Sequence, residues 1–192
     1  MHWLWAWDQA LFLRLNGRPS GGLARGAAVL FMHLSSGGLL WLALFALGFL
    51  GGGRRGRRIA LTGALAVLLA HAAAVWALAG LVQRSDPAQV VPGTLVLGPF
   101  QPRFSFPASR VAEAFAALPY LSRGGRAPTT LFWCLGLAVA FSCVYVGAAF
   151  PTDVLGGALV GWGCAALARW LLGNPFRPRR GQVVPLSRAA RH

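Results

Sequence analysis

The hydrophobic pattern of this chain consists of long apolar runs separated by short polar segments. The first run, residues 27–50, has 24 residues without a charge, enough for about 36 Å of α-helix against a hydrocarbon core of about 30 Å. Four further runs follow it, at residues 59–82, 107–122, 128–150 and 153–172. The pattern predicts an all-α, polytopic membrane helix bundle of about five transmembrane helices.

The N-terminal segment has a different pattern, because three tryptophans, Trp3, Trp5 and Trp7, stand beside Asp8. Tryptophan prefers the interface between headgroups and hydrocarbon, so we expect an amphipathic helix that lies at the membrane surface. The chain is thereby divided into three parts: an interfacial helix and turn over 1–22, a membrane-embedded bundle over 23–173, and a basic cytoplasmic tail over 174–192.

Composition supports a membrane protein. Hydrophobic residues make up 56% of the chain and charged residues 11%, whereas a soluble domain has about 25% charged residues. All 18 basic residues are arginine and only 4 residues are acidic, which gives a net charge of +14. In a soluble protein this excess would suggest nucleic acid, but the arginines fall mostly between apolar runs. Membrane topology explains them, and nucleic acid is not an expected partner.

The arginines also predict an orientation. Arg54, Arg55, Arg57 and Arg58 lie in one loop, and the other arginine-rich segments fall on the same side of the predicted bundle. The positive-inside rule places this side in the cytoplasm. We therefore expect a multi-pass cell-membrane protein, in a bacterial inner membrane, whose remaining loops face the periplasm or the exterior.

Two segments on the non-cytoplasmic side carry recognisable motifs. FSFPASR, at 104–110, and SCVYVGAAFPTDVLGGALVG, at 142–161, resemble the second and third motifs of the type 2 phosphatidic acid phosphatase superfamily. This superfamily includes lipid phosphate phosphatases and vanadium haloperoxidases. The resemblance covers about residues 8–172 and keeps the order and intervals of the motifs, so it implies a lipid phosphate phosphatase fold.

The superfamily builds its site from the motifs K-x6-R-P, P-S-G-H and S-R-x5-H-x3-D. The histidine of the third motif takes the phosphoryl group, the aspartate orients it, and the histidine of the second motif protonates the leaving group. The lysine, arginines and serine hold the phosphate oxygens. This division of labour is chemically reasonable, because a histidine nucleophile needs a fixed tautomer and the transferring phosphoryl needs preorganised donors.

The resemblance implies that this chain lacks most of those groups. Pro87, Pro107, Ser142 and Asp153 keep the residue of the motif. The other motif positions are replaced: Ala79 stands for the lysine, Asp86 for the first arginine, Ala108 for the serine, Ser109 for the glycine, Arg110 for the general-acid histidine, Cys143 for the second arginine and Ala149 for the nucleophile.

The remaining charges suggest two roles. Arg84, Arg103 and Arg110 are candidate phosphate-binding residues, because a cationic mouth would suit an anionic headgroup. A structural ion pair is the alternative role for Arg110, either with Asp153 or with Glu113 one turn further on.

Several other residues have expected structural roles. His71 lies two helical turns before Ala79, and we expect it to be a hydrogen-bonded helix residue. The glycines of the third motif are expected to allow close helix packing; they are Gly147, Gly156, Gly157 and Gly161. The three cysteines match no zinc pattern, and neither a metal nor a cofactor is predicted.

The resemblance implies a catalytically inactive pseudo-phosphatase that binds, or helps to handle, a lipid or polyprenyl phosphate among the membrane lipids. Two alternatives remain open. One is an active lipid phosphate phosphatase with an altered catalytic centre that uses Cys143 or Ser109. The other is a structural membrane subunit. The sequence predicts neither a particular protein partner nor an oligomeric state.

Overall fold

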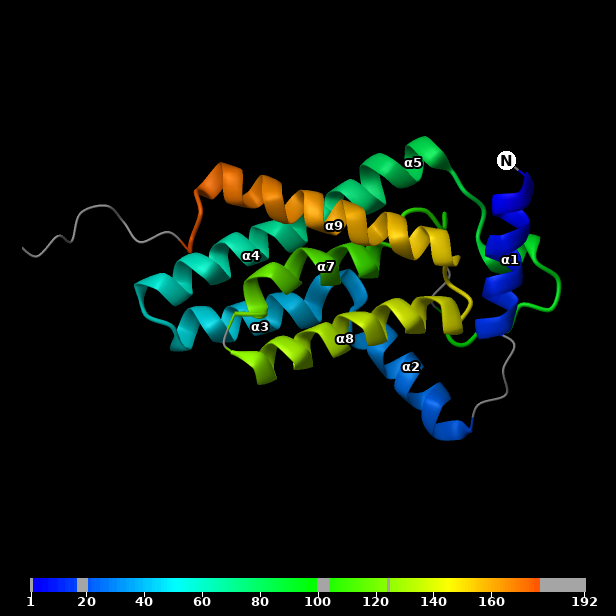
Figure 1. The fold of residues 1–192 in the computed structure, drawn as a ribbon, viewed down its shortest axis with the longest axis horizontal. Helices are drawn as coiled ribbons and strands as arrows, with labels where there is room; N and C mark the ends of the chain where they lie inside the picture. Colours follow the sequence, from blue (N-terminus) through cyan, green and yellow to red (C-terminus); the bar gives the residue numbers. More distant parts are fainter. Residues whose placement is uncertain (1, 17–20, 100–103, 124, 177–192) are drawn as a thin grey trace, which may run out of the picture.

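The computed structural model describes residues 2–16, 21–99, 104–123 and 125–176. Within these ranges the chain forms helices joined by turns and loops and contains no strand, so the all-α expectation is confirmed. The elements, in chain order, are α1 (His2–Asn16), α2 (Gly22–Leu34), the 3₁₀ turn η1 (Ser36–Gly38), α3 (Leu39–Gly51), α4 (Arg54–Ala72), the π-helical η2 (Ala73–Leu78), α5 (Ala79–Val82), α6 (Pro87–Val90), α7 (Ser109–Leu121), α8 (Arg126–Tyr145) and α9 (Pro151–Leu172) (Figure 1).

Helix α7 is the centre of the bundle, with α4, α8 and α9 packed around it (Figure 1). Every side chain from Val111 to Leu118 is buried, and half of these residues are alanine. Helix α9 approaches α7 closely because Gly157 and Gly161 have no side chain. A Cβ on Gly161 would collide with the backbone oxygen of Ala112. The expected close packing at these two glycines is therefore confirmed.

Three helical stretches are long and apolar enough to cross a membrane: Arg54–Val90, Arg126–Tyr145 and Pro151–Leu172. Helices α2 and α3 form a bent pair that can supply a fourth span. Helix α7 is shorter than these and is enclosed by its neighbours, in agreement with the short apolar run at residues 107–122. The arrangement agrees with the expected bundle of about five membrane helices.

The first apolar run is not one straight span, and this part of the prediction is wrong. The chain bends by 54° between α2 and α3. Gly37 and Gly38 have φ values of 59° and 73°, a left-handed conformation that glycine adopts without a steric penalty. The Ser35 hydroxyl donates to the carbonyl of Phe31 at 2.7 Å and closes the end of α2. The hydropathy pattern did not predict this bend, because the four residues at the bend, Ser35 to Gly38, are small and uncharged and do not interrupt the run.

Helix α1 lies across one end of the bundle (Figure 1). Its inner face consists of Asp8, Phe12 and Asn16, which are buried and spaced four residues apart. The Asn16 amide donates to the carbonyls of Leu95 and Tyr145, at 2.8 and 2.9 Å. The tryptophans expected at the interface are exposed on α1: Trp3 (71%), Trp5 (40%) and Trp7 (55%). The helix therefore has the form of the predicted interfacial helix.

Candidate functional site

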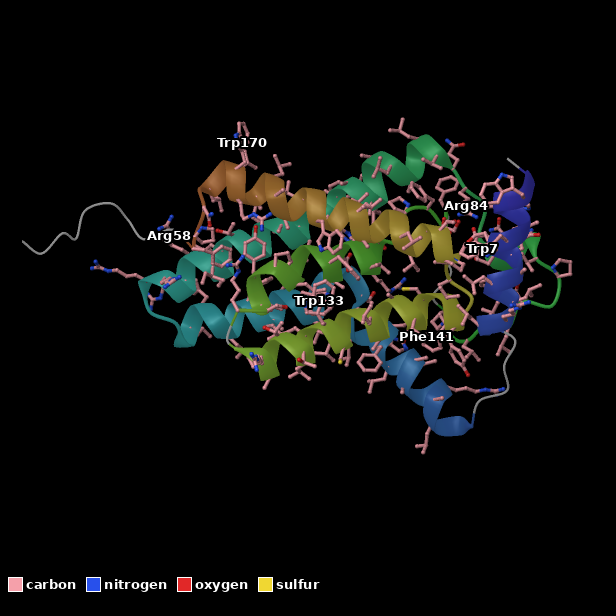
Figure 2. All side chains as sticks on the ribbon, viewed as in Figure 1. Trp7, Arg58, Arg84, Trp133, Phe141 and Trp170 are labelled. Carbon is pink, nitrogen blue, oxygen red and sulfur yellow. The ribbon has the colours of Figure 1, made fainter. Side chains whose placement is uncertain are left out.

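The two ends of the bundle differ in chemistry. Figure 2 shows Arg58 and Trp170 at one end, and Arg84 and Trp7 at the other, beside α1. The first turns of α4 carry Arg54, Arg55, Arg57 and Arg58, so these arginines belong to a helix and not to the loop that the sequence predicts. The turn between α8 and α9, which belongs to the third motif, lies at the second end (Figure 1). The candidate site therefore lies at the end away from these arginines.

A pocket of about 370 Å³ lies at the motif end. Its lining comes from four parts of the chain: η2 with the start of α5, the loop before α7, the first turn of α7, and the end of α8 with the turn that follows it. Six of the seven replaced motif positions line this pocket together: Ala79, Ala108, Ser109, Arg110, Cys143 and Ala149. The fold thus brings into one cavity residues that the motif comparison selected from distant places in the sequence.

The π-helical segment η2 forms one wall of the pocket. Ala74, Val75 and Trp76 all line it. A π-helical turn is wider than an α-helical turn, and such turns are frequent at functional sites. Because Trp76 is 77% exposed, the wall that it forms also reaches the outer surface of the bundle. In a membrane that surface faces hydrocarbon, so the pocket has an apolar side.

The turn between α8 and α9 also lines the pocket, through Ala148 and Ala149. Gly147 has a φ of 85°, and a Cβ there would come within 2.7 Å of the Leu95 oxygen. The carbonyl of Cys143 accepts the backbone N–H groups of Ala148 and Ala149, at 3.0 and 3.2 Å. Gly147 therefore serves this tight turn, which corrects the expectation that it packs two helices together. The turn leaves only a methyl group, that of Ala149, at the nucleophile position.

Arg110, on the first turn of α7, is the basic side chain among the described residues of the lining. One turn further along α7 lies Glu113, which is fully buried. Its Oε1 is 2.7 Å from Nδ1 of His71 on α4, so His71 is hydrogen-bonded as predicted. Arg110 lines the pocket together with Cys143, and it lies three residues before Glu113 on the same side of α7.

A second cluster is centred on Arg84, in the loop after α5. Its Nη2 donates to Oδ2 of Asp8 at 2.6 Å, and its Nη1 donates to the hydroxyl of Thr152 at 2.6 Å and to Oδ1 of Asp153. The Asp8 carboxylate also accepts the backbone N–H and the hydroxyl of Thr152, at 3.1 and 2.6 Å. The cluster therefore ties α1 to the first turn of α9.

Asp153 is the aspartate of the third motif, and its carboxylate contacts Arg84 and the backbone of Phe150. Its Oδ2 accepts the backbone N–H of Phe150 at 3.0 Å, which caps α9. The guanidinium of Arg84 lies 4.4 Å from the centroid of the Phe150 ring and 5.1 Å from that of Trp5. The expectation that Asp153 pairs with Arg110 is wrong, because Arg84 occupies its carboxylate.

The other predicted site residues lie elsewhere. Arg84 does not line the pocket, and Arg103 lies outside the described residues. Asp86 caps α6 by accepting the N–H of Ala88 at 3.1 Å. In the described part of the chain, no group of three His, Cys, Asp or Glu side chains could hold a metal ion.

Sequence reasoning missed the contribution of Asp8 and Thr152. A signal was present, because the whole chain has only four acidic residues. A buried acidic residue in an apolar chain needs a partner, and here the available cations are arginines. The few acidic residues therefore indicate where arginine contacts form. All four are at most 1% exposed: Asp8, Asp86, Glu113 and Asp153.

Comparisons with known proteins agree with this geometry. Residues 32–177 match the model of the PAP2 superfamily. The structure is similar to that of LpxE from Aquifex aeolicus, with a TM-score of 0.70 and 26% identity over 83% of this chain and 92% of that one. It is also similar to a transmembrane PAP2-type phosphatidylglycerolphosphate phosphatase from Bacillus subtilis, with a TM-score of 0.66 and 20% identity over 89% and 87%. A search among curated proteins gave no match.

Proposed function

This chain belongs to the PAP2 superfamily, and on that premise we propose that it is a catalytically inactive member that binds, or helps to handle, a lipid or polyprenyl phosphate. The observation that carries the proposal is the lining of the pocket at the motif positions. Ala149 stands where the nucleophile belongs and has no nucleophilic atom. The pocket is thus kept while the reacting group is absent.

The other lining residues support the lack of turnover. Arg110 occupies the general-acid position, but a guanidinium stays protonated at neutral pH and does not give up its proton. The described lining contains no histidine, aspartate or glutamate that could take over the role of acid or base. Groups that act as a unit in catalysis fail together, so the loss of several leaves little residual rate.

Lipid binding is supported by the shape and chemistry of the pocket. Its volume of about 370 Å³ lies in the range of small-molecule sites. Trp76 and Val75 extend the lining to the lipid-facing surface, where a hydrocarbon chain can enter from the side. Arg110 offers a planar guanidinium, which suits a phosphate group. One structural neighbour is named as a phosphatase of a lipid phosphate, which agrees with a lipid ligand.

The proposal includes an orientation. The pocket opens in the outer leaflet of a bacterial inner membrane, and the start of α4, with Arg54 and Arg58, lies on the cytoplasmic side. The support is the group of arginines at the start of α4, because Figure 2 shows Arg58 at the end of the bundle opposite Arg84.

Two measurements on the purified protein in nanodiscs test the proposal. Native mass spectrometry should detect bound phosphatidic acid or undecaprenyl phosphate, and an assay of phosphate release should stay at background with the same lipids. Arg110→Gln should weaken binding about tenfold or more, since it removes the cation of the lining. Arg126→Gln is the matched control, because this arginine is exposed and lies at the start of α8, whereas the pocket is lined by residues at the end of α8. Equal binding by both variants would count against the site.

An active phosphatase with an altered centre is the second candidate, because Cys143 and Ser109 both line the pocket with Arg110. Either side chain has an atom that can attack phosphorus. This candidate predicts phosphate release that disappears in Cys143→Ala or in Ser109→Ala. Such a result would replace the proposal of an inactive protein with that of an enzyme.

A further inference from the structure

The charge of the pocket differs from what a phosphomonoester requires. A phosphate monoester carries about −1.5 to −2 charges at pH 7, whereas a phosphodiester carries −1. Among the described lining residues, Arg110 alone is charged. At three further positions that hold phosphate in the superfamily motifs, the lining has Ala79, Ala108 and Cys143. These side chains supply no positive charge.

Side chains near Arg110 lower the net positive charge of the site further. Glu113 is fully buried one turn away on α7, at the i and i+3 spacing at which helical side chains are neighbours. The Glu113 carboxyl shares a contact of 2.7 Å with Nδ1 of His71. With Arg110 at +1, the three side chains sum to 0 when the hydrogen-bonded pair of Glu113 and His71 holds no extra proton, and to +1 when it holds one, on either residue. In neither state does the cluster balance two negative charges.

The neutral donors of the lining are also few. The Ser105 hydroxyl already donates to the backbone oxygen of Ser85 at 3.0 Å. Ser109 and Trp76 supply the other side-chain donors on the wall, and the rest of the lining is apolar or backbone. A second negative charge on a ligand would therefore enter a low-dielectric site without a matching cation, which is costly.

We propose that this pocket selects a lipid phosphodiester, with one negative charge, over the corresponding phosphomonoester. The inference rests on the proposed function, because it names the class of lipid phosphate that the same site binds. The hydrocarbon part is a diacylglycerol or a prenyl chain, and both fit the apolar wall at Val75 and Trp76. Arg110 holds the single charge, and Glu113 with His71 keeps the site from accepting a second one.

A matched pair of lipids tests the proposal on the unmodified protein. Dioleoyl phosphatidylmethanol and dioleoyl phosphatidic acid have the same chains and differ by one ester methyl and about one charge at pH 8. In dodecyl maltoside micelles, which contain no phosphate, competition followed by native mass spectrometry should show the diester bound about tenfold more tightly than the monoester, which corresponds to one charge left unmatched at about 1.4 kcal/mol. Farnesyl phosphate and its methyl ester form the same pair on a prenyl chain.

Two variants test whether the cluster causes the selection. Glu113→Gln keeps the shape of the side chain and removes its charge, so the preference for the diester should fall by about tenfold. Arg126→Gln, which changes the net charge at the start of α8, should keep the preference of the unmodified protein. If Glu113→Gln is not monodisperse in detergent, the lipid pair on the unmodified protein still decides the question.

The outcomes separate the inference from the proposed function. Tighter binding of the diester in either chain series supports the inference and identifies the chain class. Equal or tighter binding of the monoester overturns it, while the proposed function stands. If no lipid of either pair binds better to the unmodified protein than to Arg110→Gln, both the inference and the proposed function are refuted.

Discussion

The guanidinium of Arg84 holds the carboxylate of Asp153, and the same guanidinium holds Asp8 on the N-terminal helix. Asp153 is the one residue with a chemical role that the third motif keeps, and the motif would have it orient a histidine. Here it joins the loop after α5 to the first turn of α9, and through Arg84 to α1. Asp153, which the third motif would use to orient a histidine, therefore joins helices through Arg84 in this chain.

The Arg84–Asp153 contact should contribute strongly to stability. Asp153→Ala should lower the free energy of unfolding by about 3 kcal/mol, because removing one partner of a buried ion pair leaves an uncompensated charge. The double variant Arg84→Ala with Asp153→Ala should lose less than the sum of the two single losses, since the two residues share one interaction. Denaturant unfolding in detergent measures this cycle. Additive losses would show that the two side chains do not interact.

The glycines of α9 should differ sharply in their tolerance of a methyl group. Gly161→Ala should destabilise the protein by about 1–3 kcal/mol, because the new Cβ collides with the backbone of Ala112 and lies 2.9 Å from the nitrogen of Ala116. Gly163→Ala, two residues further along the same helix, meets nothing within 4 Å and should be neutral or stabilising. Thermal unfolding of the two variants makes the comparison. Similar melting temperatures would contradict the close approach of α9 to α7.

The orientation can be tested with single cysteines on a background in which the native cysteines are alanine. Ser85→Cys, exposed in the loop after α5, should react with an impermeant maleimide added outside the cell. Gly53→Cys, exposed before α4 with open space around its Cβ, should react only after the membrane is permeabilised. The reverse pattern would place the pocket in the cytoplasmic leaflet.

Restoring the nucleophile should not restore an enzyme. Ala149→His places an imidazole at the pocket wall, yet Asp153 stays bound to Arg84 and no acid stands opposite. We expect phosphate release from phosphatidic acid to remain within about tenfold of background. Activity in this single variant that rises by several orders of magnitude would mean that the remaining groups already suffice for turnover.

Much of the architecture followed from the sequence by itself. Apolar runs of membrane length predicted the helical bundle, and the three tryptophans before Asp8 predicted a helix at its end. The motif spacing also selected positions that converge on one pocket, among them Arg110 and Ala149. These features were predictable because hydropathy and motif intervals are carried by the chain itself, whatever path its loops take.

The tertiary structure alone decided the partners. Asp153 took Arg84 instead of Arg110, and Asp8 reached Thr152, which is 144 residues away in the sequence. The bend at Gly37 and the π-helical wall at η2 were likewise absent from the hydropathy pattern. An ion pair forms where folding brings two charges together in a setting with little water, and hydropathy along the chain does not record that distance. The partner of each charge therefore depends on how the loops and helices pack.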